Sequence, residues 1–557
     1  MVCYSVMCHG RAIPLGRLRR HLCFPQIIHL NNARRIQSRG MATSTEKTTI
    51  KRAVAGSFLF KFPGGDIKKA KVALFRRSNN VTTYQRKLAP CSGSVEEHDA
   101  SPLATALREI QEETTLPASS LDLLCVGKPY SFVDKSVGRE WSINPFAFRI
   151  KDVLEGGKGE KGITLDWEHE GIEWFDPLQV NGSDEFGGVP RIVESLRRVW
   201  PQYDLGREAG TTLTEGVQML RNEREHGARV LAAMGIMILR EVIRKMTPSK
   251  SVDESWSKIR MAAWHICQSR PSMAAAITSA MVKALCAIRP LCFTDRDLRN
   301  RFQRIGDELN QQLSLRGSTS GKVCGYFAKI LRDNILESDN PKEKVSILTL
   351  SLSSTVSEGL LRAASTLGVE LDVRIMESRP RCEGVTLGSR ILKESSEGSK
   401  LKVTLYHDAS ISQAAHGVDF VLLGADRISS AGDVYNKIGS LPAVLTARYI
   451  TPNAKILVLS ETEKIAGPGS MDEHVAEENS PLEVSRVWKE MVKGAGEIEE
   501  ALCRHDPRIA VKNAYFEWVP AELIDAYATE EGLCNTERIR QKSALIGYEI
   551  ERYFKDL

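Results

Sequence analysis

The stretch GVDFVLLGADRISSAGDVYNKIG, residues 417–439, indicates how the second half of the chain folds. Its apolar run is bounded by glycines and rich in strand-forming residues, which predicts a buried strand. Asp426 then lies at the carboxyl end of that strand, where ligands bind in open parallel sheets. We expect the next helix to begin at Asn436, whose side chain can cap it, and Lys437 to add positive charge beside free backbone N–H groups. The stretch therefore predicts a carboxylate that faces an anion site.

The region around this stretch alternates between predicted strands and helix-length segments. The predicted strands are VSILTLS, ELDVRIME, KVTLYHD, VDFVLLGAD and AKILVLSE. Such alternation is typical of βαβ units in a doubly wound parallel sheet. We therefore predict a Rossmann-like domain over residues 341–557. It follows a predicted helical subdomain over residues 196–340, where apolar residues recur at spacings of three and four.

The first part of the chain has a different pattern. Residues 51–195 contain short segments of strand character, such as AVAGSFLFKF and GIEWFDP, with one clear helix between them. This mixture predicts a compact domain of sheet and helix, so the whole chain is predicted to be an α/β multidomain protein. Residues 1–40 are rich in arginine and contain no Asp or Glu. We expect residues 1–50 to be a disordered or transit-like segment, with Met41 as an alternative start.

The composition of the chain makes several classes of function improbable. The 557 residues are 42% hydrophobic and 26% charged, as in ordinary globular proteins. The net charge of +6 is small for this length, so we expect no direct contact with nucleic acid. The 12 cysteines form no CxxC pair, which indicates reduced thiols and a cytoplasmic protein, or a mitochondrial one if the N-terminus is a transit peptide. No apolar run reaches the length that spans a membrane, so we expect no membrane contact.

A cluster of acids marks the first candidate site. LATALREIQEETTLP contains Arg108, Glu109, Glu112 and Glu113. On a helix these three glutamates are three and four residues apart, so their carboxylates point the same way. A hard divalent cation such as Mg²⁺ would turn their mutual repulsion into coordination. The alternative is an acidic helix face that contacts only solvent.

The surrounding sequence favours the metal. SGSVEEHDASPLATALREIQEETTL resembles the Nudix box, and LDWEHEGIEWFDP resembles the late strand of such domains. The resemblance implies an α/β/α sandwich that hydrolyses a nucleoside diphosphate derivative with Mg²⁺ or Mn²⁺, acting as a diphosphatase. It also implies that Glu112 and Glu113 bind the metal, that Glu109 binds the metal or assists deprotonation of water, and that Arg108 orients the glutamates.

The box departs from the family form at three positions. Gly93 lies one residue too far from Arg108, Ala100 stands where the first glutamate is expected, and Thr115 replaces a glycine. A domain that only binds its ligand is the alternative to a hydrolase. Carboxylates from nearby segments could replace the missing one, and the candidates are Asp99, Glu96, Glu97 and Glu168.

The second resemblance covers residues 208–557. GADRISSAGDVYNKIGS, together with SRPSM, ILTLSLSSTV, ESRPRCEG and NAYFEWVPAELIDAYATEEG, resembles the family of the alpha, beta and delta subunits of eukaryotic translation initiation factor 2B. The same family includes methylthioribose-1-phosphate isomerase and ribose-1,5-bisphosphate isomerase. By this resemblance Asp426 matches a catalytic aspartate, and Ser351 stands at the position of a catalytic cysteine. A serine hydroxyl is a far weaker acid than a thiol, so isomerase activity is in doubt, with Cys382 a conceivable replacement.

The resemblance leaves the anion site intact. Asn436, Lys437, Arg270 and Arg379 suit a phosphorylated sugar or nucleotide. Alternatively, the two arginines pair with Asp426 or Glu377 and hold loops together.

We therefore expect a Nudix-type hydrolase fused to an initiation factor 2B-like module that binds a phosphorylated metabolite and forms a homodimer. One alternative is a non-catalytic regulatory subunit that joins translation initiation factor 2B subunits. A second is a ribose-1,5-bisphosphate-type isomerase that uses Asp426 with another acid.

Overall fold

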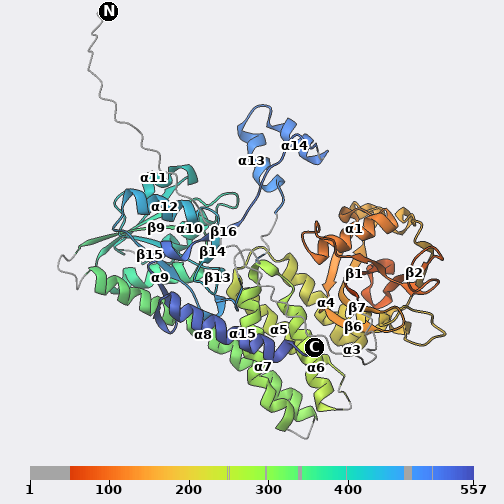
Figure 1. Ribbon diagram of the computed structural model, residues 1–557. Helices are drawn as coiled ribbons and strands as arrows, with labels where there is room; N and C mark the ends of the chain where they lie inside the picture. The colour runs from red at the N-terminus through yellow and green to blue at the C-terminus, as the bar shows by residue number, and fades with distance from the viewer. Residues whose placement is uncertain are drawn as a thin grey trace, which may run out of the picture. The chain divides into compact units, whose positions relative to one another are not determined.

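The structure is a computed structural model that describes residues 50–557, except 248, 250, 295–297, 336–341, 397, 470–473, 475–478 and 505. The expectation of a disordered or transit-like N-terminus therefore falls outside the described residues. Figure 1 labels many of the elements, which are numbered in chain order.

The N-terminal domain is built on an eight-stranded sheet (Figure 1). Its strands are β1 (Ile50–Lys61), β2 (Lys71–Arg77), β3 (Leu88–Ala89), β4 (Cys91–Ser94), β5 (Leu121–Val126), β6 (Tyr130–Asp134), β7 (Arg139–Ile150) and β8 (His169–Phe175). The central path is β3-β2-β1-β7-β5, with β4 on β1, β6 on β7 and β8 on β2. Only the β1–β7 pair is parallel among the described pairs of this sheet.

Each face of this sheet has its own apolar core. Along β1 the side chains alternate, so that Phe58 and Phe60 enter one core while Leu59 enters the other. Helix α1 (Pro102–Thr114) packs into the core of Leu59, and α2 (Ile192–Val199) packs into the core of Phe58. The predicted sandwich of helix, sheet and helix is confirmed.

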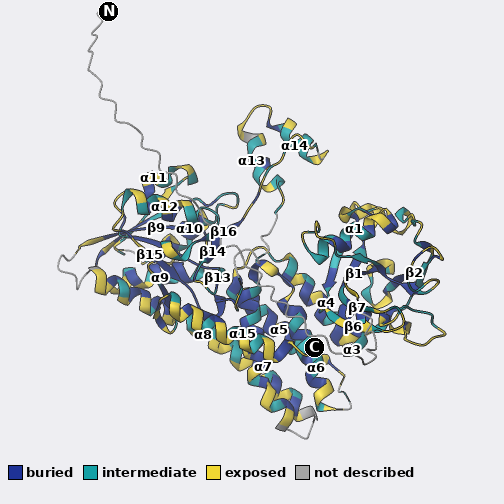
Figure 2. Ribbon diagram, viewed as in Figure 1, coloured by how far each residue is buried: buried dark blue, intermediate teal, exposed yellow. Residues whose placement is uncertain are grey.

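The central part of the chain is helical. Its helices are α3 (Gln202–Leu205), α4 (Arg207–Asn222), α5 (Ala228–Lys245), α6 (Val252–Cys267), α7 (Ala274–Thr294) and α8 (Leu298–Ile335). They share one core, to which the last helix, α15 (Thr536–Phe554), contributes Tyr553 and Phe554. Figure 2 shows the helices here with one buried and one exposed side, as expected for amphipathic helices around a common core.

One helix departs from the expectation about membrane spans. Residues 271–293 are long and apolar enough to cross a membrane by length and composition alone, although no run of that length was expected. The segment combines alanines with larger apolar residues, and Lys283 and Arg289 interrupt it, so it contains no continuous apolar run of that length. Of its 18-residue window, 67% is buried inside the protein, which fits the core helix of a globular domain.

The C-terminal domain contains the predicted doubly wound sheet. Its strands are β9 (Lys344–Leu350), β10 (Glu370–Met376), β11 (Leu401–Tyr406), β12 (Phe420–Leu423), β15 (Lys455–Leu459), β17 (Ala526–Thr529) and β18 (Gly532–Cys534). Their order is β11-β10-β9-β12-β15-β17-β18, and the pairs are parallel up to β17. The strand order therefore reverses between β9 and β12, which creates a switch point of the kind that binds ligands.

Helices cover both faces of this sheet. One core joins α9 (Ser354–Thr366), α10 (Glu383–Glu394) and part of α8 to the sheet. The other joins α11 (Ile411–Ala414) and α12 (Ser440–Ile450). Two further helices, α13 (Leu482–Met491) and α14 (Ala495–Cys503), follow β15. The predicted fold class is confirmed.

The helix predicted at Asn436 was wrong. Asn436 and Lys437 end strand β14 (Val434–Lys437), which forms a small sheet with β13 (Arg427–Ile428) and β16 (Phe516–Val519). Helix α12 begins only at Ser440, after Gly439 in a left-handed conformation with φ of 98°. The Asn436 amide donates a hydrogen bond to Ser440 Oγ at 2.9 Å instead of capping the helix. The sequence signal for a cap was misleading because strand pairing with β16 extends the chain through this segment.

Candidate functional sites

Helix α1 positions the first candidate site. Ser101 caps it by accepting a hydrogen bond from the Ala104 N–H at 3.2 Å, and Pro102 occupies its first turn. The helix ends at Thr115, which adopts a left-handed φ of 61°. Glycine is the usual residue in that conformation. Thr115, which replaces the glycine of the Nudix box, therefore ends the helix in the conformation that glycine usually adopts there.

Arg108 lies at the centre of the acidic cluster. Its Nη1 is 2.7 Å from Glu109 Oε1 and 3.0 Å from Glu112 Oε2, and its Nη2 is 3.0 Å from Asp99 Oδ2. One guanidinium thus holds two carboxylates of α1 and one of the preceding loop. This placement fits the predicted orienting role of Arg108. Asp99, named as a substitute carboxylate, contacts the arginine.

Glu113 turns inward. Its side chain is only 3% exposed, and one carboxylate oxygen accepts a hydrogen bond from the Ser92 N–H at 3.1 Å. The other oxygen has no hydrogen-bond partner among the described residues and lies 4.0 Å from His169 Nε2. Burial raises the pKa of Glu113 well above its usual value. A buried carboxylate oxygen without a partner is an acceptor to which a cation could bind.

Four carboxylates share this corner of the domain. Burial raises the pKa of Glu109, and the negative charges of Glu112 and Glu168 raise it further. Burial also raises the pKa of Glu168, again with a contribution from Glu112. Glu113 is influenced by Glu109 and Glu168 in the same way. A set of oxygen donors that repel one another fits a hard divalent cation.

The carboxylates do not converge on one point in this conformation. Over the described part of the chain, no group of three or more His, Cys, Asp or Glu side chains is placed to hold a metal ion. Glu109, Glu168 and Glu96 line one cavity, whereas Glu113 lies behind it and Glu112 is 58% exposed at the helix surface. The metal roles of Glu109, Glu112 and Glu113 stay predictions that the donor chemistry supports.

Gly93 contacts the acidic cluster directly. It lies in β4, and a Cβ atom at this position would be 1.9 Å from the Glu109 carboxylate. Only glycine leaves room for Glu109 to lie across the strand. Although Gly93 is displaced by one residue relative to the Nudix box, it packs against the predicted catalytic glutamate.

The cavity beside the cluster combines arginines with aromatic rings. Its cationic residues are Arg52, Arg77 and Arg139, and its aromatic residues are Tyr84, Tyr130, Phe132 and Trp141. Phe132 and Trp141 are paired across β6 and β7. The Tyr84 hydroxyl accepts a hydrogen bond from Trp141 Nε1 at 3.1 Å and donates one to Asp134 Oδ2 at 2.8 Å. Such a lining suits a ligand with phosphates and a flat ring.

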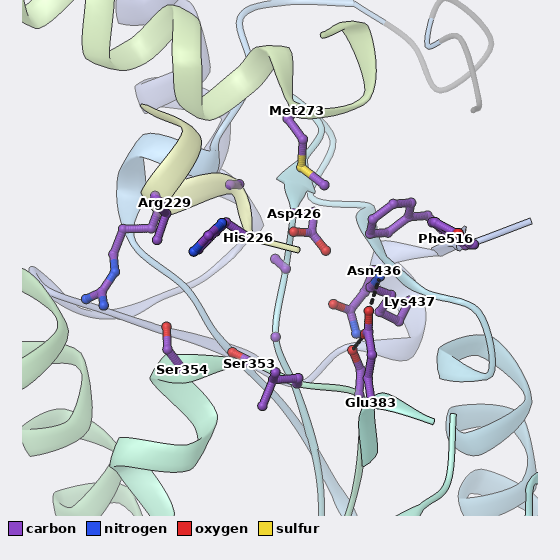
Figure 3. A pocket seen from close by; sticks show the side chains of 18 of the residues that line it. His226, Arg229, Met273, Ser353, Ser354, Glu383, Asp426, Asn436, Lys437 and Phe516 are labelled. Atoms are coloured by element: carbon purple, nitrogen blue, oxygen red, sulfur yellow. Dashed lines mark hydrogen bonds and ion pairs between the residues drawn. The ribbon is translucent and has the colours of Figure 1, made fainter. Parts of the chain in front are cut away.

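The second candidate site lies at the switch point of the C-terminal sheet. Ser351 follows β9 and Asp426 follows β12, so the two residues lie at the carboxyl ends of neighbouring parallel strands. Both line one cavity together with Arg270, Asn436 and Lys437. Asp426 therefore lines the same cavity as the residues that were predicted to bind an anion (Figure 3).

Two predicted residues lie elsewhere. Arg379 is not among the residues that line this cavity, and its backbone N–H donates to Asp408 Oδ2 at 2.7 Å. Cys382, the conceivable replacement for a catalytic cysteine, precedes α10 and is likewise not part of the lining. Five of the residues predicted for the second site thus line this cavity, namely Arg270, Ser351, Asp426, Asn436 and Lys437.

The cavity also contains residues that the sequence did not single out. They are Glu383, His226, Arg229, Arg224 and Lys464. Glu383 could have been predicted from the sequence, because it belongs to the ESRPRCEG segment. His226 and the two arginines lie in the loop before α5 and at its start, where no motif marks them. Figure 3 shows Glu383 and Lys437 joined beside Asn436, with His226 on the other side of Asp426.

Glu383 connects the elements of the cavity. Its Oε2 accepts a hydrogen bond from Ser351 Oγ at 2.8 Å, and its Oε1 is 2.9 Å from Lys437 Nζ. Ser351 has a left-handed φ of 64°, which turns its side chain at the junction of β9 and α9. Lys437 also lies 4.5 Å from the centre of the Phe516 ring. Burial raises the pKa of Asp426, against the attraction of Lys464 and Lys437.

Comparison with known proteins agrees with this architecture. The model of the NUDIX domain matches residues 52–197, and the model of the Initiation factor 2 subunit family matches residues 224–536. Methylthioribose-1-phosphate isomerase of Sulfurimonas denitrificans is 28% identical over 349 residues, 60% of this chain and 89% of that protein. The isomerase of Zea mays is 25% identical, covering 57% of this chain and 84% of that protein.

Parts of the chain are also similar to solved structures. The translation initiation factor eIF-2B of Pyrococcus horikoshii covers 58% of this chain and 96% of its own, with a TM-score of 0.42 and 20% identity. The eIF2B beta of Chaetomium thermophilum covers 61% of this chain and 92% of its own, with a TM-score of 0.44 and 16% identity. The chain belongs to the Initiation factor 2 subunit family, and a NUDIX domain precedes the family module.

Proposed function

We propose that the N-terminal domain hydrolyses a nucleoside diphosphate derivative with Mg²⁺ or Mn²⁺. The observation that carries this proposal is the set of four mutually repelling carboxylates beside a cavity of arginines and aromatic rings. The match to the NUDIX domain supports the same reaction class.

The chain's own residues would act as follows. The three arginines of the cavity bind the diphosphate, and the aromatic rings hold the base. Arg108 orients Glu109 and Glu112. Glu109 takes a proton from the attacking water, which its raised pKa favours. The water oxygen forms a bond to one phosphorus as the P–O bond of the diphosphate bridge breaks, and the bridging oxygen leaves with the other phosphate group. When bound, the metal ion supplies positive charge that acidifies the water and offsets the charge of the diphosphate.

A hydrolysis assay tests this proposal. The full chain is incubated with dinucleotides and nucleotide sugars, with Mg²⁺ or with EDTA, and released nucleoside monophosphate is measured. We expect Mg²⁺-dependent release that Glu112→Gln reduces at least 100-fold. Glu215→Gln, at an exposed position of α4, is the matched control and should retain the wild-type rate. A broad panel with no release would contradict the hydrolase.

We further propose that the C-terminal module binds a phosphorylated sugar, of the aldose 1-phosphate class that its isomerase relatives are named for. The supporting observation is a cavity at the switch point with Arg270, Arg224, Arg229 and Lys437 in its lining. Ribose 1-phosphate and ribose 1,5-bisphosphate should raise the melting temperature of the full chain. They should raise it much less in Arg270→Met.

A second candidate function is that of a regulatory subunit. The replacement of a cysteine by Ser351 favours it over isomerase chemistry that depends on a thiol. In that case the chain would co-purify with translation initiation factor 2B subunits. A homodimer that excludes them would contradict this candidate and agree with the sugar-binding proposal.

A further inference from the structure

The cavity of the N-terminal domain extends across four strands of its sheet. Over this part of the sheet the strand order is β4-β1-β7-β6, because β4 and β7 flank β1 and β6 pairs with β7. Three strand spacings separate β4 from β6, a distance of about 14 Å. Glu109 packs against Gly93 of β4, whereas Tyr130 and Phe132 belong to β6. Glu109 and the aromatic rings therefore line opposite ends of the cavity.

The register of the strands places the aromatic rings on one face. Phe132 pairs with Trp141 of β7, and Trp141 pairs with Arg52 of β1. Residues directly opposite each other in paired strands project to the same face of a sheet. Tyr130 lies two residues before Phe132, and their rings are nearly parallel, with an interplanar angle of 18° and centroids 6.2 Å apart. Together with Tyr84, these side chains form an aromatic wall of the cavity.

The polar atoms of this aromatic wall are paired within the protein. The Tyr84 hydroxyl is bonded to Trp141 Nε1 and to Asp134, and the Tyr130 hydroxyl forms a hydrogen bond with Ser195 Oγ at 2.8 Å. The backbone of Tyr84 has a left-handed φ of 52°, which is unfavourable for a tyrosine, so the fold holds this ring in place. The wall therefore offers ring faces to a ligand, while its hydroxyl and N–H groups already have partners.

Apolar side chains complete the aromatic end of the cavity. They are Val54, Ile143, Val189, Pro190 and Ile192. Thr83, next to Tyr84, is a lining residue whose hydroxyl is able to contact the edge of a base. Discrimination between ligands depends on precisely placed polar groups. A base at this end therefore meets mainly ring faces and apolar side chains.

The three arginines of the cavity supply positive charge. Their described contacts are with neutral groups. Arg52 Nη1 lies 3.5 Å from Ser94 Oγ, and Arg77 Nε donates to the Thr83 carbonyl at 3.2 Å. Arg139 lies over an aromatic ring of the wall, 5.3 Å from its centre. Their charge is therefore available to the phosphates of a ligand, which are the same whichever base is attached.

We propose that this cavity recognises a nucleoside diphosphate derivative by the faces of its base and the charge of its diphosphate, and accepts adenine, guanine, uracil and cytosine alike. This inference rests on the proposed function of the N-terminal domain. Stacking on aromatic rings tolerates any base, since every base has a π-face. Recognition of the base edge by hydrogen bonds would instead strongly reject bases without the matching groups.

Binding measurements without metal test the proposal. ADP, GDP, UDP and CDP are titrated into the full chain in EDTA and followed by calorimetry, with inorganic pyrophosphate as the probe that has no base. We expect the four dissociation constants to agree within about tenfold. Pyrophosphate should bind weaker than the nucleotides by about fivefold or more, because it cannot stack.

Variants locate the binding in this cavity. Phe132→Ala should weaken all four nucleotides by a similar factor of about five or more and leave pyrophosphate binding unchanged. Trp141→Phe keeps an aromatic ring and should bind the four nucleotides within about threefold of the wild type. Thr83→Val should change none of them. Val133→Ala is the matched control, because Val133 is 56% exposed and lies on the opposite face of β6.

Several results would overturn the inference. They are a preference of more than about tenfold for one base, pyrophosphate that binds as tightly as the nucleotides, a loss in Thr83→Val for some bases only, binding that Phe132→Ala leaves unchanged, or no binding of any nucleotide. Similar binding of the four nucleotides without Mg²⁺-dependent hydrolysis would overturn the hydrolase and leave this inference standing. Hydrolysis of the derivatives of one base alone would do the reverse.

Discussion

The ion pair between Glu383 and Lys437 offers a quantitative test of the second site. Both side chains are about 20% exposed, so the pair is intermediate between a surface and a fully buried ion pair. Surface pairs contribute up to about 1 kcal/mol, and removal of one partner of a buried pair costs about 3–5 kcal/mol. We therefore expect Lys437→Met to destabilise the module by about 2 kcal/mol. Methionine keeps an apolar stem against Phe516, so the loss reports on the charge.

A double-mutant cycle isolates the interaction. Glu383→Gln and Lys437→Met are made singly and together, and melting temperatures of the full chain are measured at low salt. We expect a coupling free energy of about 1.5 kcal/mol, because the double variant leaves neither charge unpaired. At about 2 °C per kcal/mol, the double variant should melt about 3 °C higher than the sum of the single shifts predicts. Additive shifts would show that the two side chains do not interact and would refute the reasoning.

Three further predictions concern the first half of the chain. Burial lowers the pKa of His265 to about 4, so its imidazole binds a proton more readily in the unfolded chain than in the folded one. The free energy of unfolding should be highest above about pH 6.5 and about 2 kcal/mol lower at pH 5. His265→Asn should remove this loss, as measured by melting curves at the two pH values. Ser101→Ala removes the cap of α1 and should cost about 1 kcal/mol in thermal unfolding; an unchanged transition would contradict the cap. Gly93→Ala places a Cβ against the Glu109 carboxylate and should reduce hydrolysis at least tenfold in a folded protein; an unchanged rate would show that the position of Glu109 is not critical.

The regular parts of the fold were predictable because their signals are local. The cap at Ser101, the spacing of apolar residues in α1 and the apolar run of β12 depend only on neighbouring residues. The end of β14 was not predictable in this way. Its extension through Asn436 depends on pairing with β16, about eighty residues later in the chain.

The candidate sites were predictable to the extent that motifs place residues at strand ends. Asp426 was found because it follows a strand that ends at the switch point of the sheet. Lys437 was found as a neighbour of Asp426 in the same motif, although it ends strand β14 and does not lie at the start of a helix. His226 and Arg229 were missed, because they reach the cavity from the loop before α5 and from the first turn of that helix, where no motif marks them. Arg379 is not part of this lining: Asp408 accepts a hydrogen bond from its backbone N–H, and Arg379 lines a smaller cavity together with Glu383 and Lys437, so its ligand role stays a prediction.

Metal binding by the acids of α1 is the central claim about the first site. Titration of the full chain with Mn²⁺, followed by electron paramagnetic resonance of the free ion, measures this binding directly. The account predicts saturable binding that Glu109→Gln weakens at least tenfold and that Glu215→Gln leaves unchanged. Equal binding by the wild type and by Glu109→Gln would contradict the account.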